Sequence, residues 1–200
     1  MIYDRTCRGW GPLPGLTHSW IAGGWLYRAL GRLDAYRGFE RWSDALEWLA
    51  GYAPERPISE VQYWGHGTWG TLLMDRKPLD RRALRPGHPL SPLLRTLRSR
   101  LCGARALWWF RTCETFGARP GHDFARAWVD FFGTRAAGHT FIIGPWQSGL
   151  HSLGPGEAPG WSETEGLKAG RPEEPVAARW SGPGRPHTIT CFHGAVPPGW

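Results

Sequence analysis

The feature that most constrains the fold is an alternation of helix-like and strand-like segments between Phe39 and Gly144. Three segments repeat apolar residues at helical spacing, and they are residues 39–51, 91–101 and 123–132. Four short apolar segments have the character of strands, and they are residues 58–64, 71–74, 106–110 and 140–143. Alternation of this kind is typical of helices packed on a mostly parallel sheet. We therefore expect an α/β fold.

The helices carry recognisable start and stop signals. Ser43 is expected to cap one helix, and Ser91 followed by Pro92 is expected to begin the next. Gly51 and Gly133 are expected to end helices. A further helix is predicted over residues 19–33, from apolar residues that share one face.

The two ends of the chain look different from this centre. Residues 1–16 are rich in Gly and Pro and are predicted to form an N-terminal arm of a domain that extends to residue 145. Residues 146–200 are predicted to form a loop-rich extension packed on that domain, with short strands at 177–180 and 187–192. A hairpin turn is expected between these two strands, at Pro183–Gly184.

Reactive residues follow two of the predicted strands. His66 and Gly67 follow the strand at 58–64, and Cys113 follows the strand at 106–110. Ligands of open α/β sheets bind beyond the carboxyl ends of the strands, so we expect these residues to share one site. An imidazole can ionise a thiol and later protonate a leaving amine, and the N–H groups of Gly67 and Cys113 could stabilise an oxyanion.

The same segments resemble the caspase-like cysteine peptidases. In that family a hydrophobic strand is followed by His-Gly, and a later hydrophobic strand by Cys. Here the two segments read Val61-Gln62-Tyr63-Trp64-Gly65-His66-Gly67 and Leu107-Trp108-Trp109-Phe110-Arg111-Thr112-Cys113. His66 and Cys113 are 47 residues apart, close to the roughly 50 of caspases. Residues 39–145 carry the resemblance, which is nearest to the bacterial CHAT-type proteases because Arg111-Thr112-Cys113-Glu114-Thr115 replaces the caspase pentapeptide.

The resemblance implies a three-layer caspase-like fold and a His66–Cys113 dyad that hydrolyses peptide bonds through a thioester. A peptide or protein is the expected substrate, a regulatory protein is a further expected partner, and no cofactor is expected. Trp69 and Trp146 are near the predicted strand ends and are candidates for lining a substrate pocket. Glu114 either orients His66 or faces solvent.

Two alternatives remain open. The chain could be a catalytically inactive caspase-like domain that binds a protein partner. It could also bind nucleic acid through residues 76–119, which hold eleven basic residues against two acidic ones and so have a local net charge of +9. No nucleic-acid-binding motif accompanies this segment, so nucleic acid is not the expected partner.

Several other classes are disfavoured. Cys7, Cys102, Cys113 and Cys191 are too widely spaced for a structural zinc site, and the histidines show no metal-ligand spacing. A serine nucleophile elbow and a phosphate-binding loop are both missing from the sequence. No apolar run has the length of a membrane span, and no export signal is recognisable. We expect a cytoplasmic protein with free thiols that does not bind membranes.

Overall fold

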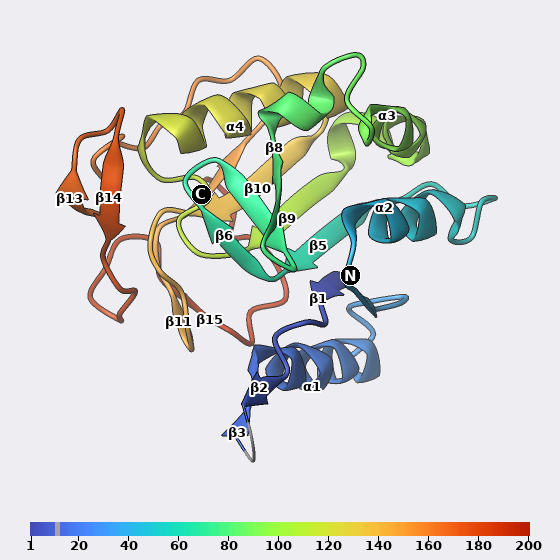
Figure 1. Ribbon diagram of the computed structural model, residues 1–200, viewed down its shortest axis with the longest axis horizontal. Coiled ribbons are helices and arrows are strands. Elements are labelled where there is room, and N and C mark those ends of the chain that lie inside the picture. Colours follow the sequence, from blue (N-terminus) through green and yellow to red (C-terminus); the bar gives the residue numbers. More distant parts are fainter. Residues whose placement is uncertain (11–12) are drawn as a thin grey trace.

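The computed structural model describes residues 1–10 and 13–200, and its centre is a six-stranded sheet (Figure 1). The strand order is β12-β10-β9-β5-β1-β4. The bounds are β1 (Ile2–Asp4), β4 (Arg37–Phe39), β5 (Glu60–Trp64), β9 (Leu107–Arg111), β10 (Arg135–His139) and β12 (Leu150–Leu153). All neighbours run parallel except β12, which is antiparallel to β10. This sheet confirms the predicted α/β class.

Helices cover both faces of the sheet. Alternate residues of each strand point to opposite faces, and apolar residues on both faces need a covering layer. The helices are α1 (Leu16–Ala29), α2 (Trp42–Gly51), α3 (Ser91–Arg100) and α4 (Ala118–Phe132), with short 3₁₀ turns η1 (Arg81–Leu84) and η2 (Gly103–Arg105). Val61, Trp108 and Phe110 join the core formed with α2, α3 and α4. Tyr3 and Trp64 point the other way and pack with Tyr27 of α1. Figure 1 shows α1 on the opposite side of the sheet from α2, α3 and α4.

Smaller β elements extend from the central sheet. An antiparallel sheet follows β5 and consists of β6 (His66–Thr68), β7 (Thr71–Met74) and β8 (Lys77–Asp80). Three two-stranded pairs are β2 (Gly9–Trp10) with β3 (Leu13–Pro14), β11 (Trp146–Gln147) with β15 (Ile189–Thr190), and β13 (Leu167–Gly170) with β14 (Pro175–Ala178).

The N-terminal segment differs from the prediction of an arm over residues 1–16. Residues 2–4 form β1, which lies between β4 and β5 and is buried throughout. Three residues are too few to show a periodic pattern, so pairing with two long-range neighbours, and not the local sequence, determines this strand. The helix that follows begins at Leu16 and ends at Ala29, several residues earlier than predicted.

One predicted strand, one predicted turn and one predicted hairpin are also corrected. The strand expected at 140–143 is found at Arg135–His139, where small residues fit between covering layers although they have weak strand preference. His66, expected in a turn, begins β6. The hairpin expected across Pro183–Gly184 does not form, because β14 pairs with β13 and β15 pairs with β11.

The helix caps differ in detail from the prediction. Arg41 and Leu90 occupy the capping positions, so Ser43 and Ser91 lie one or two residues inside their helices. Gly133 ends α4 as predicted, with a left-handed φ of 66° that favours glycine.

Residues 146–200 are tied closely to the sheet. They supply β12, and a buried arginine anchors their later part. Arg111, at the end of β9, donates to the Tyr27 hydroxyl at 2.8 Å and to the Cys191 carbonyl at 2.7 Å. Its guanidinium also lies 4.5 Å from the ring centres of Trp64 and Trp109. One of the cations of the basic segment therefore has an internal structural role.

Candidate active site

The predicted reactive residues lie at one edge of the sheet. Strands β5 and β9 are parallel neighbours, and Trp64 at the end of β5 is in register with Arg111 at the end of β9. His66 lies two residues after Trp64, and Cys113 lies two residues after Arg111. The carboxyl ends of adjacent parallel strands meet at the same edge, where α/β proteins bind ligands.

Gly67 lies directly against the turn that carries Cys113. A Cβ atom at Gly67 would be 2.3 Å from Thr115 Oγ1, 2.8 Å from Thr112 Cβ and 3.0 Å from the Cys113 carbonyl oxygen. Separations below 3.0 Å leave no room for a side chain, so only glycine permits this approach. The backbone after β5 and the backbone after β9 are therefore in contact.

His66 has an exposed side chain whose ring lies edge-on to Trp20, with the ring centres 6.0 Å apart. Along β6, His66 and Thr68 point to one face, whereas Gly67 faces the Cys113 turn. Among the residues that the structure describes, none forms a hydrogen bond with this imidazole. No hydrogen bond to the described residues therefore fixes the ring, which packs against Trp20.

The surroundings of the Cys113 thiol disfavour its ionised form. Its sulfur lies 3.9 Å from the Ile143 carbonyl oxygen, a weak hydrogen-bond contact. Burial, and secondarily the charge of Glu114, raise the pKa of the Cys113 thiol to about 11. Since no hydrogen bond joins the sulfur to His66 within the described chain, the structure brings the two chain segments together but does not pair the two side chains.

The turn after Cys113 is tightly held. The hydroxyls of Thr112 and Thr115 are 2.6 Å apart, and the Thr115 hydroxyl donates to the Cys113 carbonyl at 3.1 Å. Glu114 has a left-handed φ of 39°, an uncommon backbone conformation for a residue with a side chain. No backbone carbonyl of the described residues accepts from the Cys113 N–H, which leaves this donor available for another acceptor.

Glu114 connects this turn to β6. Its carboxylate lies near the Thr68 side chain, on the face of β6 that also carries His66. Burial raises the pKa of the Glu114 carboxyl to about 7. Its Oε2 atom is buried without a hydrogen-bond partner in the described residues. Glu114 is therefore not a simple solvent-facing residue, although it makes no hydrogen bond with His66.

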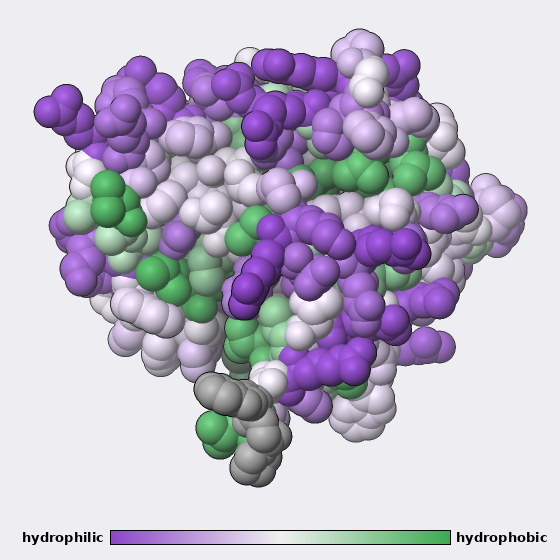
Figure 2. Space-filling view, viewed as in Figure 1, coloured by the Kyte–Doolittle hydropathy of each residue, from purple (hydrophilic) through white to green (hydrophobic). Residues whose placement is uncertain are grey.

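Trp69 contacts the segment that follows Cys113, and Trp146 is close in sequence to the residue that contacts the sulfur. Trp69 is half-buried, and its Cδ1 atom would be 3.3 Å from a Cβ at Gly117, four residues after Cys113. Trp146 is 43% exposed and lies three residues after Ile143, whose carbonyl contacts the sulfur. Figure 2 shows apolar side chains exposed among hydrophilic ones between the β13–β14 pair and β6 on the viewed face.

The basic segment 76–119 does not form one uniform positive surface. Arg100 donates to four backbone carbonyls, including those of Ala53 and Arg56. Arg119 forms ion pairs with Glu163 and Glu173. A pocket of about 410 Å³ is lined by Arg81, Arg82, Arg85 and Arg119, but also by Asp80, Asp123 and Glu173. Much of the local charge is therefore compensated within the fold.

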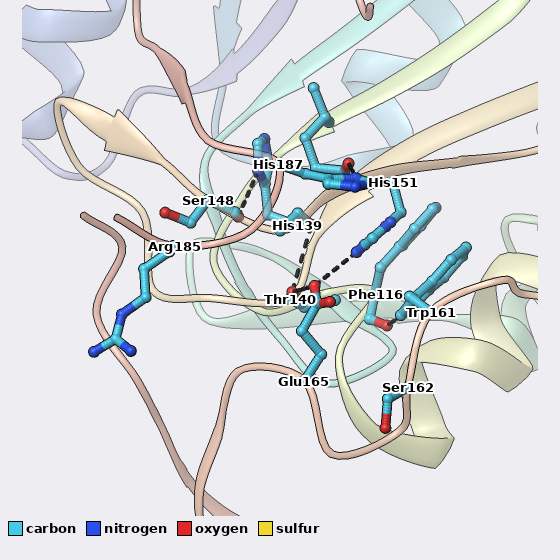
Figure 3. A network of polar contacts seen from close by, with 12 residues as sticks. Phe116, His139, Thr140, Ser148, His151, Trp161, Ser162, Glu165, Arg185 and His187 are labelled. Carbon is cyan, nitrogen blue, oxygen red and sulfur yellow. Dashed lines mark hydrogen bonds and ion pairs between the residues drawn. The ribbon is translucent and has the colours of Figure 1, made fainter. Parts of the chain in front are cut away.

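A buried polar network was not predicted from the sequence (Figure 3). His151 Nε2 lies 2.6 Å from Glu165 Oε1, which also accepts from the Thr140 hydroxyl at 2.7 Å. The His151 ring stacks on Trp161, which in turn stacks on Phe116, three residues after Cys113. Glu165 lies in a loop 14 residues after His151, so no local spacing could have indicated the pair.

Within residues 1–10 and 13–200, no cluster of three or more His, Cys, Asp or Glu side chains could hold a metal ion. In the same residues, no helix has the length and apolar character needed to cross a membrane. No family model matches the chain, and neither a curated protein nor a solved structure shows significant similarity to it.

Proposed function

We propose that the protein is a caspase-like cysteine endopeptidase in which Cys113 is the nucleophile and His66 the general acid and base. The observation that carries the proposal is the close approach of Gly67 to the Cys113 turn. This contact holds an imidazole-bearing strand beside a thiol-bearing turn, at the sheet edge where α/β proteins bind ligands. The layered α/β architecture and the strained backbone at Glu114 agree with the proposal.

Because His66 lies on the other face of β6 from the Cys113 turn, the reaction would begin with a shift of the β6 backbone that brings the imidazole toward the sulfur. The imidazole takes the thiol proton, and the thiolate attacks the carbonyl carbon of the peptide bond. The N–H groups of Cys113 and Gly67 hold the oxyanion of the tetrahedral intermediate. The intermediate collapses to a thioester when the C–N bond breaks and His66 gives its proton to the leaving amine. Water, deprotonated by His66, then hydrolyses the thioester and restores the thiol.

The resting state implies that substrate binding takes part in activation. At a pKa of about 11 almost no thiolate exists at neutral pH, so His66 must approach before attack can occur. The exposed imidazole and the weak sulfur contact with Ile143 both allow such a change. A peptide bound between Trp69 and Trp146 would lie over the sulfur and exclude water from the dyad.

The second candidate is an inactive caspase-like domain that binds a protein partner. The neutral thiol, which has no hydrogen bond to an imidazole in the described chain, favours this alternative. The exposed Trp146 and the apolar side chains near β13–β14 would then form part of a partner surface (Figure 2).

The deciding experiment is hydrolysis of a fluorogenic peptide library by the wild-type protein and by three variants. Cys113→Ala and His66→Ala are expected to abolish cleavage, while Cys102→Ala, which changes another partly buried thiol, should retain it. Cleavage that persists in Cys113→Ala would refute the proposed nucleophile. A wild-type protein that cleaves no peptide or protein substrate would leave the inactive interaction domain as the better account.

A further inference from the structure

The helix α1 exposes an apolar stripe where a surface helix normally carries polar side chains. The stripe consists of Ile21, Ala22, Trp25 and Ala29, which share one face because residues three and four apart are neighbours on a helix. All four are exposed, Ile21 by 41% and Trp25 by 65%. The stripe faces away from the residues that α1 buries against the sheet, and Figure 1 shows α1 as the outermost layer on its side.

Close packing fixes the orientation of α1 on the sheet. A Cβ at Gly23 would be 2.6 Å from the Trp64 ring, and one at Gly24 would be 2.7 Å from the Tyr36 ring. Only glycine permits so close an approach, which leaves the helix no room to roll and bury its outer face. The stripe is therefore a lasting feature of the surface.

The charge around the stripe has one sign. Residues 5–33 contain four arginines and no Asp or Glu, and two of these arginines share the carboxylate of Glu40. The next acidic residue along the chain, Asp34, pairs with Arg56 at 3.6 Å. Arg28 borders the stripe, is exposed and forms no ion pair within the described part of the chain. Unpaired positive charge beside an apolar surface selects a partner that carries carboxylates next to its own apolar residues.

The shape of the stripe fits a second helix laid along α1. Trp25 stands between the small side chains of Ala22 and Ala29. A partner helix can approach α1 closely beside these alanines, while the indole fills a groove between the partner's side chains. An amphipathic helix with acidic residues at the edge of its apolar face would meet both the stripe and Arg28.

We infer that the outer stripe of α1 is the docking surface for an acidic amphipathic helix of a partner protein. The apolar face of that helix buries Trp25 and Ile21, and a carboxylate at its edge pairs with Arg28. Docking on α1 does not require Cys113. Trp20 of the same helix nevertheless packs against His66, with the ring centres 6.0 Å apart.

Two other occupants fit the stripe less well. A second copy of the chain, packed through the same face, would place one basic surface against another, whereas a self-complementary contact needs both signs of charge. An anionic bilayer is recognised by clusters of about four to eight Lys and Arg residues. The helix α1 has a single arginine, Arg28, and so lacks such a cluster.

Selection from a phage-displayed library of helical peptides tests the inference on the wild-type protein. Every peptide carries leucines at the apolar heptad positions, and the flanking positions vary among Glu, Lys, Gln and Ser. We expect the selected peptides to be enriched in Glu. In fluorescence polarisation, Trp25→Ser should weaken binding of a selected peptide about thirtyfold, as loss of a tryptophan hot spot does. Arg28→Glu should weaken it about tenfold and should strengthen binding of the same peptide with Lys in place of Glu.

Matched controls change residues of the same kind elsewhere on the surface. Trp180→Ser alters an indole that is 68% exposed, and Arg98→Glu alters an exposed arginine of α3. Both should leave the affinity unchanged. Cys113→Ala should bind the peptide as the wild type does, whatever its effect on proteolysis, which separates this surface from the proposed function. Circular dichroism verifies that each variant is folded.

Several outcomes would overturn the inference. They are a selection that yields no peptide binding at submillimolar concentration, selected sequences that favour Lys or neutral residues over Glu, and binding that survives Trp25→Ser in a folded variant. A wild-type dimer in sedimentation velocity that Trp25→Ser abolishes would assign the stripe to a second copy instead. Flotation with vesicles of phosphatidylcholine and phosphatidylserine, lost in the same variant, would assign it to a membrane surface.

Discussion

Replacement of Gly67 by alanine tests the contact on which the candidate site depends. The new Cβ would be 2.3 Å from Thr115 Oγ1 and 2.8 Å from Thr112 Cβ, whereas ordinary contacts begin at 3.4 Å. The strand after β5 and the Cys113 turn would have to separate by about 1 Å, since both threonines are fully buried. Overpacking of this kind costs about 1–3 kcal/mol of unfolding free energy. A displacement of about 1 Å between reacting groups can also lower kcat/KM roughly 100-fold.

Urea denaturation and peptide hydrolysis measure these two effects. Gly51→Ala is the control, because a Cβ at Gly51 meets no atom within 4 Å at the end of α2. It should be neutral or slightly stabilising. A double-mutant cycle with Thr115→Ala should show a coupling of at least about 0.5 kcal/mol, since that change removes the nearest clashing atom. If Gly67→Ala keeps wild-type stability and activity, the two segments are not in contact and the reasoning is wrong.

Three further predictions concern charge and burial. The raised pKa of Cys113 means that the folded state favours the neutral thiol, so this group's contribution to stability is complete below pH 9 and is lost as pH rises toward 11. In urea denaturation, the unfolding free energy of the wild type should therefore fall by about 2–3 kcal/mol more than that of Cys113→Ala over this pH range. Unfolding free energies that change with pH in parallel in the two proteins would contradict this. Glu114→Gln removes a charge that raises the pKa of Cys113, so iodoacetamide should modify Cys113 faster at pH 8 in this variant than in the wild type. An unchanged or slower rate would show that burial alone sets the thiol pKa. Arg111→Met leaves the buried Gln147 Oε1 atom without its donor and removes one of the two donors to the Cys191 carbonyl, so it should cost about 1–3 kcal/mol, whereas exposed Arg98→Gln should cost almost nothing. Equal losses in these two variants would show that Arg111 has no special structural role.

The central part of the fold was predictable because its elements are long enough to show a period. The helices α2, α3 and α4 are found within a few residues of the predicted segments, and Thr71–Met74 matches its predicted strand. The apolar run before Cys113 is a buried strand, Leu107–Arg111, and Cys113 follows its end as predicted. These segments bury apolar faces that the sequence itself displays.

The errors occur where long-range pairing determines the structure. Strand β1 has three residues and β10 reads Arg-Ala-Ala-Gly-His, so neither has the apolar pattern of a buried strand. The strand β12 carries His151 in its middle and was assigned to a loop-rich extension. In each case neighbours distant in sequence supply the hydrogen bonds and the packing.

The candidate site was predictable as a location but not as a chemical state. Sheet topology implies that residues after β5 and β9 share an edge, and the structure places His66, Gly67 and Cys113 there. The contact between Cys113 and the Ile143 carbonyl depends on the path of a loop, as does the burial of Glu114. Loop paths of this kind have no signature in local sequence.

Covalent capture of Cys113 by a peptide electrophile tests the central claim most directly. A peptidyl acyloxymethyl ketone places a carbonyl over the sulfur and alkylates the thiolate, which in the proposed dyad forms when His66 accepts the thiol proton. We predict that mass spectrometry will find the adduct on Cys113 of the wild type and that His66→Ala will lack it, while Cys102 stays unmodified in both. An adduct on Cys113 that forms equally fast without His66, or one found on Cys102 instead, would contradict the account.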